Sequence, residues 1–110
     1  MNFQIRSKNV TLNDATKAHI EGAVEAFKKY SLEITTINCM VGAEKKGVTV
    51  EFDIHIAHEQ PVVISQSDDS LDAAIDLAIE KGNKALRRLH EKIVSHKSSG
   101  SVKDLETLDA

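Results

Sequence analysis

A long amphipathic helix is the strongest structural signal in this chain, and we expect it to run from Asp68 to Lys97. Its apolar residues recur at intervals of three or four, the spacing of one buried face of an α-helix. They are Leu71, Ile75, Ile79, Leu86, Leu89 and Ile93. Ser70 is the expected N-cap. Gly82 fills the gap in this stripe, which predicts that the helix closely approaches the sheet or another helix there.

Charge is divided along the length of this helix. The first part, Asp68 to Glu80, has five acidic residues and no base, whereas Lys81 to Lys97 has six bases and one acid. The helix macrodipole favours this polarity by about 0.3 to 1 kcal/mol per charge, but it does not require the bases to align. One set of bases is spaced to form a single exposed row, which could follow a phosphate backbone. It consists of Lys81, Lys84, Arg88 and Lys92. The acids Asp72, Asp76 and Glu80 are expected on a different line.

The remaining apolar pattern predicts one more helix and four strands. Residues 13–30 have helical spacing, with Asn13 or Thr11 available as the cap. Alternation of apolar and polar residues predicts strands at residues 2–7, 34–41, 48–56 and 62–66, with a hairpin turn over residues 42–47.

The order βαβββα predicts an α+β fold of two layers. We expect a four-stranded mixed sheet with two helices on one face, in which the first two strands are parallel and the others antiparallel. Residues 1–97 should form one domain, and residues 98–110, which carry three acids and one base, should form a flexible acidic tail.

Composition indicates a soluble, globular, cytoplasmic protein, which we expect to be a monomer. Of the 110 residues, 41% are hydrophobic and 28% are charged. No apolar run approaches the roughly 18 residues of a membrane span, and the N-terminus lacks the apolar region of a signal peptide. The single cysteine, Cys39, lies in an alternating apolar run, so we expect it to be buried.

The net charge of −3 argues against a general nucleic-acid binder, because such proteins are usually basic overall. Residues 1–97 hold 13 bases and 14 acids, so they are close to neutral. Any site for a polyanion must therefore be a local basic patch.

No enzyme motif is present. The chain lacks a Walker loop, G-x-S-x-G, G-x-G-x-x-G and H-E-x-x-H. His55 and His58 lie on a strand and in a turn, and His19, His90 and His96 are scattered on helices with no carboxylate constellation to orient them. The acids at the start of the long helix have no calcium-loop spacing. We therefore expect a non-enzymatic protein without a metal or cofactor.

The long helix resembles the ribosome hibernation promoting factor family, which includes the ribosome-associated inhibitor A and is sometimes labelled sigma-54 modulation protein. The similar stretch is Asp69-Ser70-Leu71-Asp72-Ala73-Ala74-Ile75-Asp76-Leu77-Ala78-Ile79-Glu80-Lys81, followed by the bases. The opening Ile5-Arg6-Ser7-Lys8-Asn9-Val10 and the order of elements are similar too, over about residues 1–97. The length corresponds to the single-domain form. The chain departs from the family at Gly82, where a large apolar residue is usual.

This resemblance implies the βαβββα fold and binding to the small ribosomal subunit near the decoding region, across the tRNA and mRNA sites, which silences translation under stress. It also implies that bases of the long helix contact phosphates of ribosomal RNA. These are Lys81, Lys84, Arg87, Arg88 and Lys92. On the first helix, only Lys28 and Lys29 suggest a further contact. The alternative, favoured by the net acidity, is a protein interaction module that uses the polarised helix without binding RNA.

Overall fold

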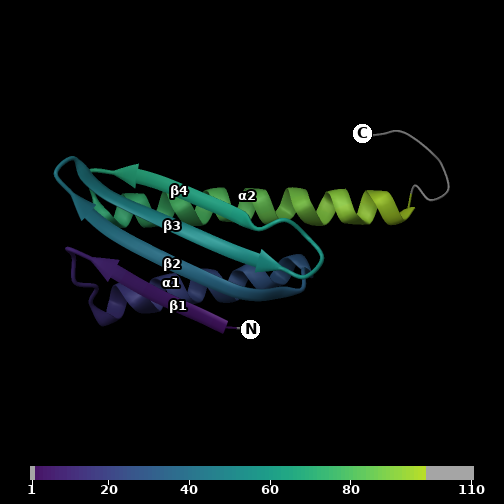
Figure 1. The fold of residues 1–110 in the computed structure, drawn as a ribbon, viewed down its shortest axis with the longest axis horizontal. Helices are drawn as coiled ribbons and strands as arrows, with labels where there is room; N and C mark the ends of the chain where they lie inside the picture. Colours follow the sequence, from purple (N-terminus) through teal and green to yellow (C-terminus); the bar gives the residue numbers. More distant parts are fainter. Residues whose placement is uncertain (1, 99–110) are drawn as a thin grey trace.

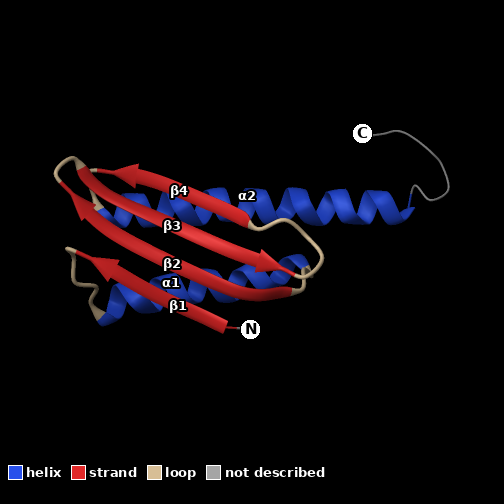
Figure 2. Cartoon of the chain, viewed as in Figure 1, coloured by secondary structure: helices blue, strands red, loops and turns tan. Residues whose placement is uncertain are grey.

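The computed structural model describes residues 2–98, with side chains described for residues 2–94. A four-stranded sheet forms one layer, and two helices on one face of it form the other (Figures 1 and 2). The elements are β1 (Asn2–Lys8), α1 (Asp14–Phe27), the short 3-10 helix η1 (Lys28–Tyr30), β2 (Ile34–Glu44), β3 (Gly47–Ile56), β4 (Val62–Asp68) and α2 (Leu71–Ser98). The predicted α+β class and element order are confirmed.

The strands lie side by side in the order β1-β2-β3-β4. β1 and β2 are parallel, with Ile5 opposite Cys39, because α1 crosses the sheet between them. The pairs β2–β3 and β3–β4 are antiparallel, as predicted.

The hairpin between β2 and β3 is tighter than the sequence indicated. Instead of a turn over residues 42–47, β2 continues to Glu44 and β3 begins at Gly47, so that only Lys45 and Lys46 lie between them. Gly47 has a φ of 143°, and a Cβ there would lie 2.5 Å from the carbonyl oxygen of Asp68. Glycine therefore permits both the turn and the contact with the end of β4.

The predicted start of α2 at Asp68 is wrong by three residues, because Asp68 pairs with Val48 as the last residue of β4. The predicted cap is confirmed: the Ala73 amide donates to Ser70 Oγ at 3.4 Å. In α1, Asn13 Oδ1 accepts from the Thr16 amide at 2.7 Å, so Asn13 is the cap. The predicted flexible tail, residues 98–110, lies outside the described residues except for Ser98, which ends α2.

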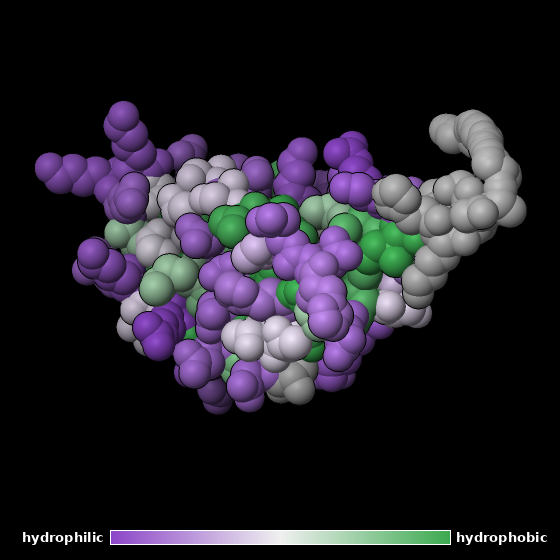
Figure 3. All heavy atoms as spheres, turned by 45° about the vertical axis from the view of Figure 1, so that its right-hand side comes forward, coloured by the Kyte–Doolittle hydropathy of each residue, from purple (hydrophilic) through white to green (hydrophobic). Residues whose placement is uncertain are grey.

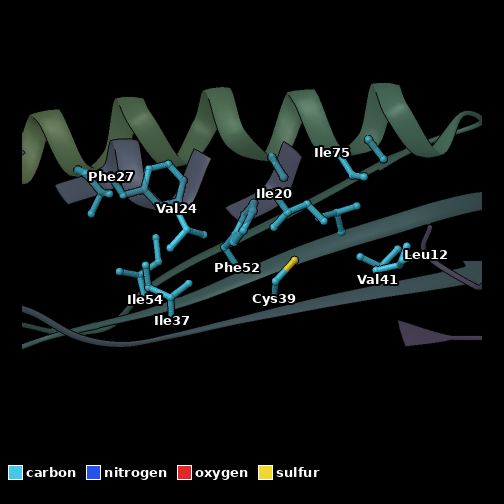
Figure 4. Close-up of a cluster of buried hydrophobic side chains, with 14 of the residues drawn as sticks. Leu12, Ile20, Val24, Phe27, Ile37, Cys39, Val41, Phe52, Ile54 and Ile75 are labelled. Atoms are coloured by element: carbon cyan, nitrogen blue, oxygen red, sulfur yellow. The ribbon is translucent and has the colours of Figure 1, made fainter. Parts of the chain in front are cut away.

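The core lies between the sheet and the two helices (Figure 4). The largest fully buried side chains include Phe27 from α1, Phe52 from β3 and Ile75 from α2. The rings of Phe27 and Phe52 meet edge to face with centroids 5.7 Å apart, a geometry that contributes about 0.5 to 1.5 kcal/mol beyond area burial. The core thereby ties both helices to the middle of the sheet.

Gly82 lies at a close approach of the two helices. It is buried, and a Cβ at this position would lie 2.9 Å from Cζ of Phe27. The predicted close approach is confirmed, and the neighbour is a side chain of α1.

The helices run in the same direction, and α2 is the longer. His19 lies beside Asp76, and Tyr30, the last residue of η1, lies beside Asn83. Residues of α2 after Asn83 therefore continue beyond the end of η1, and Figure 1 shows α2 extending past the end of the sheet. The part that projects is the C-terminal part of the basic half, because Gly82 and Leu86 are still buried and Leu89 still packs against the core.

Candidate nucleic-acid interface

All seven bases predicted to contact RNA are exposed at the surface. They are Lys28, Lys29, Lys81, Lys84, Arg87, Arg88 and Lys92. Five of them belong to α2, and two belong to η1. Their exposure follows from the amphipathic pattern, since the apolar stripe of α2 turns the opposite side of the helix to solvent.

Five of these bases form no ion pair with any described side chain, and they define what we call the free cation set. It consists of Lys29, Lys81, Arg87, Arg88 and Lys92. Lys28 is 3.1 Å from Glu25, and Lys84 is 3.9 Å from Glu80. Exposed i,i+4 pairs contribute only about 0.3 to 0.5 kcal/mol, so a phosphate could replace Glu80 as the partner of Lys84 at small cost.

The acids and the bases of α2 meet at Glu80 and Lys84, which are one turn apart and in contact. Steps of four residues connect Asp72 to Lys92 through this pair, and each step turns by about 40° around the axis, since a residue advances by about 100°. The acids at the start of this row and the bases at its end therefore lie on different sides of α2, and the bases occupy a broad side and not a single narrow line.

The structure brings η1 close to α2 through Tyr30. Its hydroxyl donates to Asn83 Oδ1 at 2.9 Å, and Lys29 Nζ lies 5.2 Å from the centre of its ring. From the sequence, Tyr30 was expected only as the last residue of the helix predicted over residues 13–30. A contact between residues 53 positions apart leaves no signal in local spacing.

Two histidines have carboxylate partners, and for His19 the sequence analysis expected none. His19 Nε2 is 2.9 Å from Asp76 Oδ1, and His55 Nε2 is 3.2 Å from Asp53 Oδ2. The first pair is exposed and the second is partly buried. Within the residues that the structure describes, no group of three or more His, Cys, Asp or Glu side chains could hold a metal ion. The described part of the chain thus supplies two separate histidine–carboxylate contacts.

Cys39 is a buried thiol in β2. It is 1% exposed, and burial raises its pKa from 9.0 to about 12. Because the folded state holds the thiol proton more tightly than the unfolded state, this stabilising contribution is complete below about pH 9. It is lost as the pH rises from about 9 to 12.

The thiol of Cys39 is therefore expected to resist alkylation in the native protein at pH 8 and to react readily in concentrated urea. Mass spectrometry after treatment with iodoacetamide measures the modified fraction. Rapid labelling without urea would contradict the buried position of the side chain.

The surface is mixed in character. Figure 3 shows one face on which hydrophilic side chains surround smaller hydrophobic patches. Among the described residues, the large hydrophobic side chains that are clearly exposed are Met40, Val63 and Val94. They belong to β2, β4 and α2, so they do not form one continuous apolar interface. In residues 2–98, no helix is long and apolar enough to cross a membrane.

Comparisons with known proteins relate the chain to ribosome-associated proteins. The family model described as "Sigma 54 modulation protein / S30EA ribosomal protein" matches residues 3–94. A search of curated proteins gives no match.

Two solved structures have a similar fold. The N-terminal domain of Protein Y from Thermus thermophilus superposes with a TM-score of 0.70 and 20% identity, covering 81% of this chain and 99% of that one. A ribosomal subunit interface protein from Coxiella burnetii gives a TM-score of 0.71 and 16% identity, covering 81% and 97%. At these identities the likeness shows the shared fold.

Proposed function

Because the chain belongs to the family of sigma 54 modulation proteins and S30EA ribosomal proteins, we propose that it inhibits translation by binding ribosomal RNA through the exposed bases of α2. The role is that of a hibernation factor, active under stress or in stationary phase. It requires no catalysis and no cofactor, because occupying a surface needed by another ligand is enough to inhibit.

The observation that carries this proposal is the free cation set on α2 and η1. A cation that forms no ion pair gains more free energy from binding a phosphate than a paired cation does, since no existing contact is lost. The guanidinium groups of Arg87 and Arg88 can each bind a phosphate through two hydrogen bonds, while the lysines act as mobile point charges.

The dimensions of α2 suit a polyanion. From Lys81 to Lys92 the helix advances about 17 Å at 1.5 Å per residue. A nucleic-acid duplex presents one phosphate per roughly 1.7 Å of its axis, if DNA is taken as the guide. Each basic side chain in this segment of α2 could therefore contact a different phosphate without any change in the helix.

We further propose that the target is the small ribosomal subunit near the decoding region, where the bound protein excludes tRNA or mRNA. Two observations support this target: the resemblance of residues 69–92 to the hibernation factors, and the similar structure named a ribosomal subunit interface protein. The protein would act as a monomer in the cytoplasm.

A protein interaction module remains the second candidate. Its support is the net charge of −3 and the half-buried Leu89 and Ile93 on the projecting part of α2. An apolar protein interface and a phosphate interface respond differently to salt, so binding measurements separate the two functions.

We expect the purified protein to co-sediment with 30S and 70S particles and to leave 50S particles unbound. If four or five phosphates are contacted, a threefold rise in salt should weaken binding roughly a hundredfold, because each contact releases about one counterion. Sedimentation at several salt concentrations, with the protein quantified in pellet and supernatant, measures both effects.

Two results would reject this function. One is a protein that stays in the supernatant with all three particles at low salt. The other is binding that is indifferent to salt, which would favour the protein interface.

A further inference from the structure

Tyr30 joins the end of the first helical segment to the basic half of α2. Its hydroxyl donates to Asn83 Oδ1 at 2.9 Å across a gap of 53 residues, and this bond is partly shielded from solvent. Asn83 lies one turn before Arg87 on α2. Tyr30 is consequently held on the side of α2 that carries Arg87, which is about 40° around the axis from Asn83.

The same ring carries Lys29. The Nζ atom lies 5.2 Å from the ring centre, within the range of a cation–π contact. Lys29 has no ion pair with any described acid, whereas its neighbour Lys28 is held by Glu25 at 3.1 Å. Of the two lysines in η1, Lys29 is therefore the one that forms no ion pair with a described acid, and its contact is with the ring that is bonded to α2.

We infer that Tyr30 and Asn83 are positioning residues that hold Lys29 beside α2, on the side that carries Arg87, so that the RNA site spans η1 and α2. This inference rests on the proposed function and names a part of its site. A free lysine loses rotamer freedom when it binds a phosphate, and a lysine already held on a ring loses less. Neither Tyr30 nor Asn83 needs to touch RNA, because each acts through Lys29.

A purely structural role for the Tyr30–Asn83 bond makes a different prediction. The buried contact between Phe27 and Gly82 already joins the helices one residue before Asn83. If the Tyr30 bond only added to this packing, its loss would change stability and would affect RNA binding equally whether or not Lys29 is present. Dependence on Lys29 thus separates positioning from packing.

The experiment measures binding to 30S particles for Lys29→Gln, Tyr30→Phe and Asn83→Leu and for the combinations with Lys29→Gln. At 0.1 M salt, Lys29→Gln should weaken binding five- to tenfold and reduce the salt slope by about 0.7 to 0.9, the effect of one phosphate contact. Tyr30→Phe and Asn83→Leu should each weaken it by roughly threefold, since both remove the same hydrogen bond and leave Lys29 less well held. Neither should weaken binding further in the Lys29→Gln chain.

Lys28→Gln is the matched control, because it removes the same charge from the adjacent exposed residue. Asn83→Leu should still weaken binding by its full factor in the Lys28→Gln chain. If Asn83→Leu has its full effect in the Lys29→Gln chain as well, the positioning role is wrong although the proposed function stands. If the unaltered protein does not bind 30S particles, the proposed function itself fails.

Discussion

Replacing Arg87, Arg88 and Lys92 with glutamate is expected to weaken binding to the small ribosomal subunit by about 500-fold or more. On the slope of about 0.9 per phosphate, each lost contact costs nearly tenfold at 0.1 M salt, and three added acids repel the RNA as well. All three residues are exposed and unpaired with described acids, so the core keeps its packing. Binding isotherms with 30S particles give the affinity, and circular dichroism tests the fold.

The control for this variant changes the same amount of charge elsewhere. Lys8, Lys45 and Lys46 are exposed at the end of β1 and in the β2–β3 turn, away from the projecting half of α2. Replacing these three lysines with glutamate should change the affinity for 30S particles far less. Equal losses from both triple variants would mean that net charge alone controls binding, and a folded α2 variant with full affinity would favour the protein interface.

The secondary structure could be predicted because the apolar residues follow two clear periods. Steps of three and four residues indicated α2, and alternation of apolar and polar residues indicated the four strands. These patterns also predicted which side chains of each element would face the core. The ends of elements depended on particular contacts. Pairing of Asp68 with Val48 extended β4, and this pairing could not be seen until the register of the sheet was known.

The candidate site was predictable as a set of exposed bases but not as an arrangement. Which bases are free depends on neighbours such as Glu25 and Glu80, and both of these pairs follow ordinary helical spacing. The bond between Tyr30 and Asn83 was not predictable, because only the packing of α1 against α2 brings these residues together.

Replacing Gly82 with leucine is expected to lower the free energy of unfolding by about 3 kcal/mol, the upper end of the usual cost of overpacking. The first added carbon alone would lie 2.9 Å from Cζ of Phe27, whose ring is fully buried and contacts Phe52. Because the ring is packed within the core, we expect the helices to separate. For a domain of this size the melting temperature should fall by about 12 to 24 °C.

Gly22 provides the matched control for this substitution, because it is a helix-interior glycine in α1 whose added Cβ would meet nothing within 4 Å. Gly22→Leu should raise stability by about 0.5 to 1 kcal/mol through helix propensity alone.

Phe27→Leu removes the ring that blocks Gly82, so it should lower the free energy of unfolding less in the Gly82→Leu chain than in the unaltered chain. Thermal unfolding of the unaltered chain, Gly82→Leu, Phe27→Leu and the double variant measures this coupling. Stabilisation by Gly82→Leu would show that α2 can accept the large apolar residue usual in the family, and that close approach to α1 is not why glycine stands here.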